Sequence, residues 1–281
     1  MTHLQLQSQR LGPEFGDAMQ LVPAASVVYA YENLLTGLAG LQHCKRLTML
    51  YLQNNQLATM SGIEACVNLR LLHLGHNRLT RVEGLQNCRQ LEELHVSHQR
   101  PDTKDGFERP LDFCPDSIAA LAYSLQTLSA AGNRMQDVGH LTMLQQVQSL
   151  DLSVNDFARA SDLTDVLSNP YLKKVQLHGN PFAAQERKYR TTIVLQTPAV
   201  EEIDGRAVLP QERDFVRRLE EQKRKLQVQR RAHLQRKQGL AGSLAGRPPV
   251  ATMTSAGLGG MGGGMGGTLS GPAVLQDLLD R

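Results

Sequence analysis

Leucines recur through most of the chain with a period of 22 residues. Residues 47–68 read LTMLYLQNNQLATMSGIEACVN, and residues 69–90 read LRLLHLGHNRLTRVEGLQNCRQ. Aligned with each other, both fit L-x-x-L-x-L-x-x-N-x-L, with apolar residues again at positions 14 and 17 and cysteine at position 20. Residues 125–146 and 147–168 keep this frame. Self-similarity at such a fixed period indicates stacked structural repeats.

The spacing has a physical cause. Positions 4 and 6 point to the same face of a short strand, because successive side chains of a strand alternate. Asparagine at position 9 follows the strand, where its amide can satisfy backbone groups that a sharp buried bend leaves unpaired. A single repeat buries too little apolar surface to offset the cost of ordering it, so the repeats must stack. The pattern predicts an α/β fold, a right-handed leucine-rich-repeat solenoid.

About eight repeats are expected over residues 1–182, the first of them a degenerate turn through Leu4, Leu6 and Leu11. The repeat that begins at Leu91 is irregular, because 34 residues separate it from the next one at Leu125. We place an insertion at 99–124, containing a short helix on the convex side that is capped by Asp116 or Ser117. Two interpretations stay open: a tolerated surface insertion or a partner contact.

The rest of the chain divides by composition. Residues 183–209 predict a C-terminal cap, with an amphipathic helix around Lys188–Leu195 covering the last repeat. Residues 210–238 predict a basic helix, since 211–238 hold ten Lys/Arg and four Asp/Glu, a net charge of +6. Its basic residues are Arg217, Arg218, Lys223, Arg224, Lys225, Arg230 and Arg231. A Gly-rich linker (239–271) and a short docking helix (272–281) follow, the latter with an apolar stripe of Leu275, Leu278 and Leu279. The alternative for residues 272–281 is a frayed terminus.

The basic helix at 210–238 has two open interpretations, a solvated extension or a contact with an acidic surface such as tubulin or nucleic acid. The net charge of the whole chain, +3, does not by itself indicate a nucleic-acid partner. The start of the sequence does not read as a signal peptide, and we find no apolar stretch long enough to span a membrane. We therefore expect an intracellular protein with reduced thiols, in which Cys44, Cys66 and Cys88 are buried at position 20. No catalytic or cofactor-binding motif is found, so no enzyme and no cofactor are expected.

Strand positions 3, 5, 7 and 8 are expected to face outward on the concave side. Tyrosine and histidine are concentrated there, and tyrosine is enriched in protein interfaces. The predicted partner-binding residues are Tyr29, Tyr31, Glu32, Tyr51, Gln53, His73, His76, Glu93, His95 and His98. A metal site on the four histidines is the weaker interpretation, because an open ladder offers little enclosure.

The repeats and cap resemble the SDS22-like leucine-rich-repeat family. The match rests on the 22-residue repeats, on LEELHVSHQR (91–100) with the insertion directly after it, and on the cap residues Tyr189-Arg190 and Ile203-Asp204-Gly205. It covers about residues 1–208. The resemblance implies a non-catalytic scaffold, associated with protein phosphatase 1, in the cytoplasm and cytoskeleton: cilium or flagellum axoneme, centrosome or basal body. Expected partners are the phosphatase catalytic subunit, tubulin or axonemal proteins.

The sequence contains no R/K-V-x-F docking motif, so a phosphatase contact would use the concave surface. A second hypothesis stays open, that of an SDS22-type subunit of a spliceosomal-like ribonucleoprotein with the basic helix near RNA.

Overall fold

We describe residues 2–101, 109–186 and 188–244 of a computed structural model of the chain, and side chains of the long C-terminal helix as far as 235. The chain divides into two compact units, Met1–Lys225 and Leu226–Arg281. The first unit contains all the repeats. Most of the predicted linker and the whole predicted docking helix, with Leu275, Leu278 and Leu279, lie outside the described residues.

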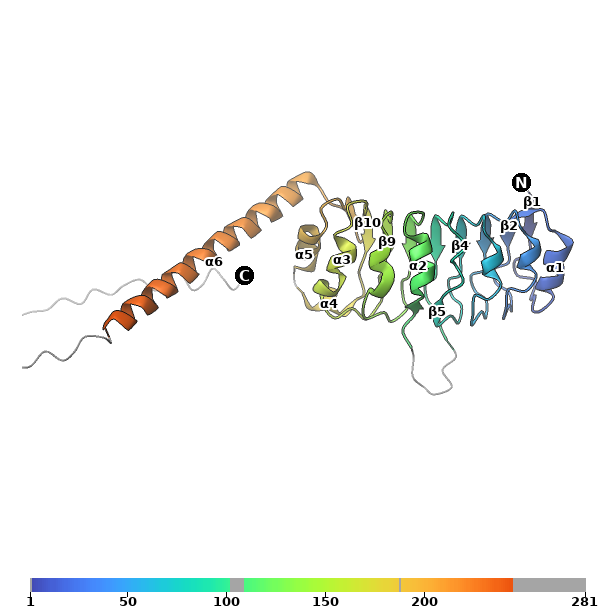
Figure 1. Ribbon diagram of the computed structural model, residues 1–281, viewed down its shortest axis with the longest axis horizontal. Helices are drawn as coiled ribbons and strands as arrows, with labels where there is room; N and C mark the ends of the chain where they lie inside the picture. Colours follow the sequence, from blue (N-terminus) through green and yellow to red (C-terminus); the bar gives the residue numbers. More distant parts are fainter. Residues whose placement is uncertain (1, 102–108, 187, 245–281) are drawn as a thin grey trace, which may run out of the picture. The chain divides into compact units, whose positions relative to one another are not determined.

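The repeats form one long parallel sheet (Figure 1). In order across the sheet, its strands are β1 (Thr2–Gln5), β2 (Ala25–Tyr29), β3 (Met49–Tyr51), β4 (Leu71–His73), β6 (Glu93–His95), β8 (Thr127–Ser129), β9 (Ser149–Asp151), β10 (Lys174–Gln176), β11 (Glu202–Ile203) and β12 (Arg206–Ala207). Each pair is parallel except β11 with β12. Leu50, Leu72 and Leu94 are direct partners in register. The predicted leucine-rich-repeat solenoid is confirmed.

The core lies behind the sheet and runs continuously through the repeats. Positions 4 and 6 are buried in each repeat from β2 to β10, as Leu50 and Leu52 illustrate. In the first turn, Leu4, Leu6 and Leu11 are partly buried against the same core. Cys44, Cys66 and Cys88 are buried at position 20, as predicted. Buried thiols here fill apolar space, and burial raises the pKa of Cys66 to about 12.

Position 9 forms a ladder of buried amides. The Asn77 amide nitrogen donates to the carbonyls of Leu52 (3.0 Å) and Leu74 (2.9 Å), and its oxygen accepts from the Leu57 backbone N–H (3.0 Å). One side chain thus joins two successive turns, which confirms the role expected for this asparagine. Gln99 occupies the same place in the irregular repeat and bonds the Leu74 and Val96 carbonyls and the Leu79 N–H. The sequence pattern did not identify Gln99 as a member of this ladder.

Position 8 adopts a left-handed backbone conformation, which the sequence analysis did not foresee. The φ angles there are +57° at Asn54, +55° at His76, +57° at His98 and +55° at Val154. Glycine takes this position as Gly132 and Gly179. The turn after each strand therefore has one conformation, whatever residue the sequence supplies.

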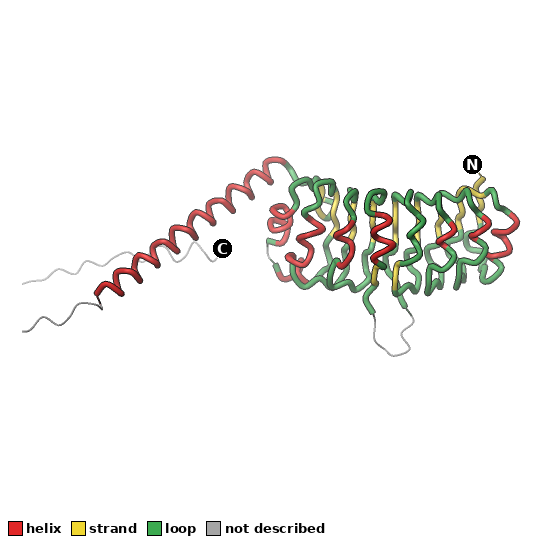
Figure 2. The backbone as a smooth tube through the Cα atoms, viewed as in Figure 1, coloured by secondary structure: helices red, strands yellow, loops and turns green. Residues whose placement is uncertain are grey.

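Short helices return the chain on the side opposite the strands (Figure 2). They are α1 (Phe15–Leu21), η1 (Leu41–His43), η2 (Ile63–Ala65), α2 (Pro115–Leu121), η3 (Gly139–Met143), η4 (Ala160–Leu163) and α3 (Thr164–Leu167). The insertion helix α2 is present, but its predicted cap is wrong. The helix begins at Pro115, the N-cap residue is Cys114 without a side-chain cap bond, and the buried Ser117 hydroxyl accepts from the Leu85 N–H instead.

The insertion also adds a small second sheet. Strand β5 (Arg81–Val82) pairs in parallel with β7 (Asp112–Phe113), and Val82 and Phe113 are buried. The Arg81 guanidinium lies 3.4 Å from the Asp112 carboxylate across this pair. This sheet ties the end of the long repeat to the repeat before it.

The cap contains α4 (Pro181–Gln185), α5 (Tyr189–Gln196) and the pair β11–β12. Ile193, Val194, Val200 and Ile203 are buried in the same core as the repeats. The Tyr189 hydroxyl donates to the Asp204 carboxylate, whose other oxygen accepts from the Leu177 backbone N–H (2.7 Å). These contacts close the end of the core.

The basic helix predicted over 211–238 is present as α6 (Pro210–Leu244). It continues past Gln238, so the linker boundary predicted at 239 is wrong, and residues 239–244 are helical. Its first turns are attached to the cap: Glu212 pairs with Arg190 (2.8 Å), Arg213 donates to the Val200 carbonyl (2.6 Å), and Val216 is buried. Among the helices of the described residues, none is long and apolar enough to cross a membrane.

Candidate partner-binding surface

A row of aromatic and imidazole rings crosses five strands on the open face of the sheet. The rings are His3, Tyr29, Tyr51, His73 and His95, and we call them the ring row. Successive ring centroids are 6.3, 4.9, 6.5 and 5.0 Å apart. Tyr29 stacks on Tyr51 and His73 stacks on His95, with interplanar angles of 14° and 20°.

The row follows from the sheet register. Tyr29, Tyr51, His73 and His95 are direct partners on β2, β3, β4 and β6, because position 5 recurs once in every turn. Adjacent strands of a sheet are about 4.8 Å apart, close to the distance at which rings stack. Tyr29, Tyr51, His73 and His95 were predicted to face outward on the concave side; His3, in the degenerate first turn, was not.

A second pair of rings lies at position 8. His76 and His98 stack with centroids 4.9 Å apart and an interplanar angle of 17°. Both residues have the left-handed backbone of this position. The four predicted histidines therefore form two separate stacks, not one cluster.

Polar groups border the ring row on the same face. The Glu93 carboxylate lies 3.6 Å from His95 Nε2, and Ser97 and Ser129 share a hydrogen bond of 2.7 Å. Gln53 and Tyr31 are half-buried, while Glu32 is exposed at position 8 and accepts a bond from the Ser8 hydroxyl (2.8 Å). Beyond β6 the row ends, because position 5 becomes Ser129 and then Asp151.

Burial and neighbouring bases keep part of this surface uncharged. Desolvation, together with His95 and His76, lowers the pKa of His73 to about 4. Desolvation and His98 lower the pKa of His76, and desolvation raises the pKa of Tyr51. At neutral pH, Tyr51 and His73 therefore present neutral, partly desolvated rings. Such amphipathic rings lose little solvation when a partner covers them.

No group of three or more His, Cys, Asp or Glu able to hold a metal ion occurs among the residues that the structure describes. The stacked geometry explains this, since each histidine pair offers two rings lying face to face. Stacked rings direct their nitrogens sideways and not toward one shared point.

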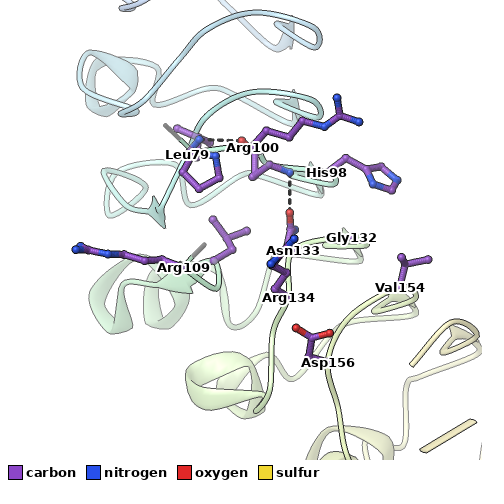
Figure 3. Close-up of a pocket in the computed structure, with 12 residues that line it drawn as sticks. Leu79, His98, Arg100, Arg109, Gly132, Asn133, Arg134, Val154 and Asp156 are labelled. Carbon is purple, nitrogen blue, oxygen red and sulfur yellow. Dashed lines mark hydrogen bonds between the residues drawn. The ribbon is translucent and has the colours of Figure 1, made fainter. Parts of the chain in front are cut away.

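A hollow of about 640 Å³ lies where the insertion leaves the repeats (Figure 3). His98, Arg100, Arg109 and Arg134 line it, and Asp156 is the acidic residue of its wall. Two hydrogen bonds join residues of its lining: the Gln99 backbone N–H donates to the Asn133 side chain (2.9 Å), and the Leu79 N–H donates to the Gln99 side chain (3.0 Å). The hollow adjoins the histidine pair at position 8.

The predicted basic residues of α6 fall in both compact units. Arg217, Arg218, Lys223, Arg224 and Lys225 are exposed on the helix that follows the cap. Arg230 and Arg231 belong to the part of α6 in the second unit. The five residues of the first unit follow the cap, whereas the ring row lies on β1 to β6.

Comparison with solved structures supports the fold. The leucine-rich-repeat domain of APL1B matches with a TM-score of 0.52 and 19% identity, over 71% of this chain and 53% of that one. An internalin (inlF) from Listeria monocytogenes matches with a TM-score of 0.51 and 16% identity, over 73% of this chain and 61% of that one. At this identity the likeness shows a leucine-rich-repeat fold alone. No family model matches the chain.

The SNF/U2A' complex of Drosophila melanogaster also matches, with 15% identity over 77% of this chain. The TM-score is 0.26, so this match carries no argument about function.

Proposed function

We propose that this protein is a non-catalytic scaffold that binds another protein through the ring row and its polar border. The observation that carries the proposal is the continuity of the row over five neighbouring strands, with centroid spacings of 4.9 to 6.5 Å. Each ring is held by the sheet and by its neighbour. Little side-chain entropy therefore remains to be lost when a partner binds.

The neutral ring of His73 favours a protein partner over a nucleic acid. His73 is uncharged at neutral pH, because its pKa is about 4, and Glu93 adds a carboxylate beside the row. Phosphate backbones are bound mainly by cationic side chains. A flat apolar or aromatic protein surface with a basic group opposite Glu93 fits better.

We further propose that the partner is the catalytic subunit of protein phosphatase 1 or a component of microtubule-based structures such as an axoneme, centrosome or basal body. The support is the likeness to the SDS22-like family, and within it to protein phosphatase 1 regulatory subunit 42. The cap residues that carry this likeness, Tyr189 and Asp204, contact each other directly. Without an R/K-V-x-F motif, the phosphatase contact would have to use the ring row.

The test is a capture experiment with the full chain immobilised. Purified phosphatase catalytic subunit, polymerised microtubules and axonemal extract are applied in turn, and binding is measured for wild type and for the double variant Tyr51→Ala with His73→Ala. Truncation of central interface aromatics costs about 2 kcal/mol or more each, so at least a roughly tenfold loss of affinity is expected.

The matched control is Tyr123→Ala with His140→Ala, two exposed residues on the helical side of the solenoid. Normal capture by this control, with weak capture by the first variant, supports the ring row. Equal capture by both variants, each with a wild-type melting temperature, would remove the ring row as the binding surface. If the wild-type chain captures none of the three probes, the proposed phosphatase and microtubule partners are rejected.

A further inference from the structure

The exposed part of α6 carries an apolar stripe with basic flanks. Phe215 and Leu226 are 66% and 56% exposed, although both are large and apolar. Leu219 lies between them and is half-buried. Residues spaced four and seven apart lie on one face of a helix, so these three side chains share a stripe.

The stripe follows a heptad pattern. With Leu219, Leu226 and His233 at position a, the d positions are Phe215, Gln222 and Gln229. Positions a and d form the seam of a coiled coil. Glutamine and histidine in a seam weaken it and restrict which partners fit, so a selective seam is expected and not a strong general one.

The flanks of the stripe carry one sign of charge. Positions e and g hold Arg218, Lys223, Lys225 and Arg230, and within the described side chains after Val216 they hold no acidic residue. The two glutamates of this region, Glu220 and Glu221, fall at positions b and c, away from the seam. There they pair within the helix, Glu221 with Lys225 at 2.9 Å and Glu220 with Lys223 at 3.4 Å.

This charge arrangement disfavours self-association. In a parallel pair of α6 helices, Arg218 would face Lys223 of the second copy, and Lys225 would face Arg230. Charges at e and g set the choice of partner in coiled coils, and like charges across the interface are unfavourable. A partner helix with acidic e and g positions would replace each of these repulsive contacts by an attractive one.

The helix is also anchored at its base. Arg190 binds Glu212 with two hydrogen bonds of 2.8 and 3.1 Å, and Arg213 donates to carbonyls of the cap. Val216, at the first e position, is buried on the cap and not left for a partner. The seam therefore starts from a fixed end, which reduces the entropy lost when a partner helix binds.

We propose that α6 forms a heterotypic coiled coil with an acidic amphipathic helix of another protein, and that its basic e and g positions exclude a second copy of this chain. This surface is independent of the ring row. The chain would thereby hold two partners, one on the sheet and one on the helix.

The test uses the full chain and three probes: a synthetic peptide of about three heptads with Leu at a and d and Glu at e and g, a scrambled peptide of identical composition, and a single-stranded RNA oligonucleotide. Fluorescence anisotropy is expected to show binding of the heptad peptide at least roughly tenfold tighter than that of the scrambled peptide. If the scrambled peptide or the RNA binds as tightly, the surface is only electrostatic and the proposal is wrong.

Two pairs of variants separate stripe from charge. Phe215→Gln with Leu226→Gln should reduce affinity for the heptad peptide roughly tenfold or more, while Val228→Gln with Leu234→Gln, equally exposed but off the stripe, should not. Arg218→Glu with Lys225→Glu should lower the affinity of the chain for the acidic peptide. The same variant should bind more tightly to a peptide with the same heptads but with Lys at e and g. Arg224→Glu with Arg231→Glu makes the same change in net charge on the back of the helix. Equal effects of the two charge pairs would overturn the proposal, as would sedimentation of the wild-type chain as a dimer that Phe215→Gln with Leu226→Gln dissociates.

Discussion

His73 and His95 stack with their ring centroids 5.0 Å apart on neighbouring parallel strands. Two imidazoles this close cannot both be protonated without repulsion. Burial of His73 is the larger cause, repulsion from His95 and His76 adds to it, and together they lower the pKa of His73 from 6.5 to about 4. The fold therefore holds His73 neutral well below the pH at which an unfolded chain would protonate it.

This stack predicts a pH dependence of stability. As the pH falls from about 6.5 to about 4, the unfolded chain binds a proton at His73 before the folded chain does, so the stability present above pH 6.5 is progressively lost. Because the side chain is partly exposed, screening reduces the effect to about 1–2 kcal/mol. Urea denaturation at pH 7.5 and pH 5 should show a smaller loss for His73→Gln than for wild type. His140→Gln, on the exposed side of η3, should keep the wild-type loss; an unchanged loss in His73→Gln would contradict the prediction.

The amide ladder predicts a large cost for one small substitution. Asn77→Ala leaves the carbonyls of Leu52 and Leu74 and the N–H of Leu57 buried without their partner. Buried unsatisfied groups of this kind should lower the free energy of unfolding by roughly 2–4 kcal/mol. Asn87→Ala in the same repeat removes an exposed bond to the Glu64 carbonyl and should cost less than about 0.5 kcal/mol. Equal midpoints in denaturant for the two variants would show that the ladder is not needed.

The solenoid was predictable from sequence because its determinants are periodic. Leu50, Leu72 and Leu94 recur at one spacing, and that spacing places them in register in the core. The outward position of Tyr51 and His73 follows from the alternation of side chains along a strand. Periodicity therefore also located most of the candidate site.

Features that break the period were not predictable in the same way. Gln99 replaces the expected asparagine, and only its hydrogen bonds show that its amide joins two successive turns as the asparagines do. Asp116 or Ser117 was predicted as the helix cap, because both residue types are good caps, but the Ser117 hydroxyl instead accepts a hydrogen bond from the Leu85 N–H. A tertiary contact has overridden a local preference. The pairing of β5 with β7 likewise depends on where the insertion returns to the sheet.

The cap predicts a further effect on stability. Tyr189→Phe removes the hydrogen bond to the Asp204 carboxylate but keeps the edge-on contact with Phe182, whose centroid is 6.2 Å away. Hydrogen bonds to charged groups are worth about 1.5–3 kcal/mol, and a loss within this range is expected. Tyr171→Phe, at an exposed tyrosine directly before the last repeat, is the matched control. Hydrogen exchange should accelerate in β10 and β11 of the Tyr189 variant first; uniform acceleration along the solenoid would contradict a local role of the cap.

Val154 predicts a stabilising substitution, because its backbone has the left-handed conformation of position 8 (φ +55°). Branched side chains are strained there, whereas asparagine and glycine accept it. The same position in the next repeat is Gly179, where a Cβ would lie 3.0 Å from the Val154 Cγ2, so the valine side chain lies close to this glycine. Val154→Asn should therefore raise the free energy of unfolding by about 1 kcal/mol, since the residue is half exposed and loses little burial.

The comparison for this substitution is Val67→Asn, which makes the same chemical change at an exposed valine whose φ is not positive. It should leave the unfolding free energy unchanged or slightly lower, because no strain is relieved. A third variant, Val154→Gly, relieves the strain as well but increases the entropy of the unfolded chain, so it should gain less than Val154→Asn. If urea denaturation shows the same gain in unfolding free energy for Val67→Asn as for Val154→Asn, the gain comes from replacing an exposed apolar side chain by a polar one. The left-handed turn then imposes no strain on valine.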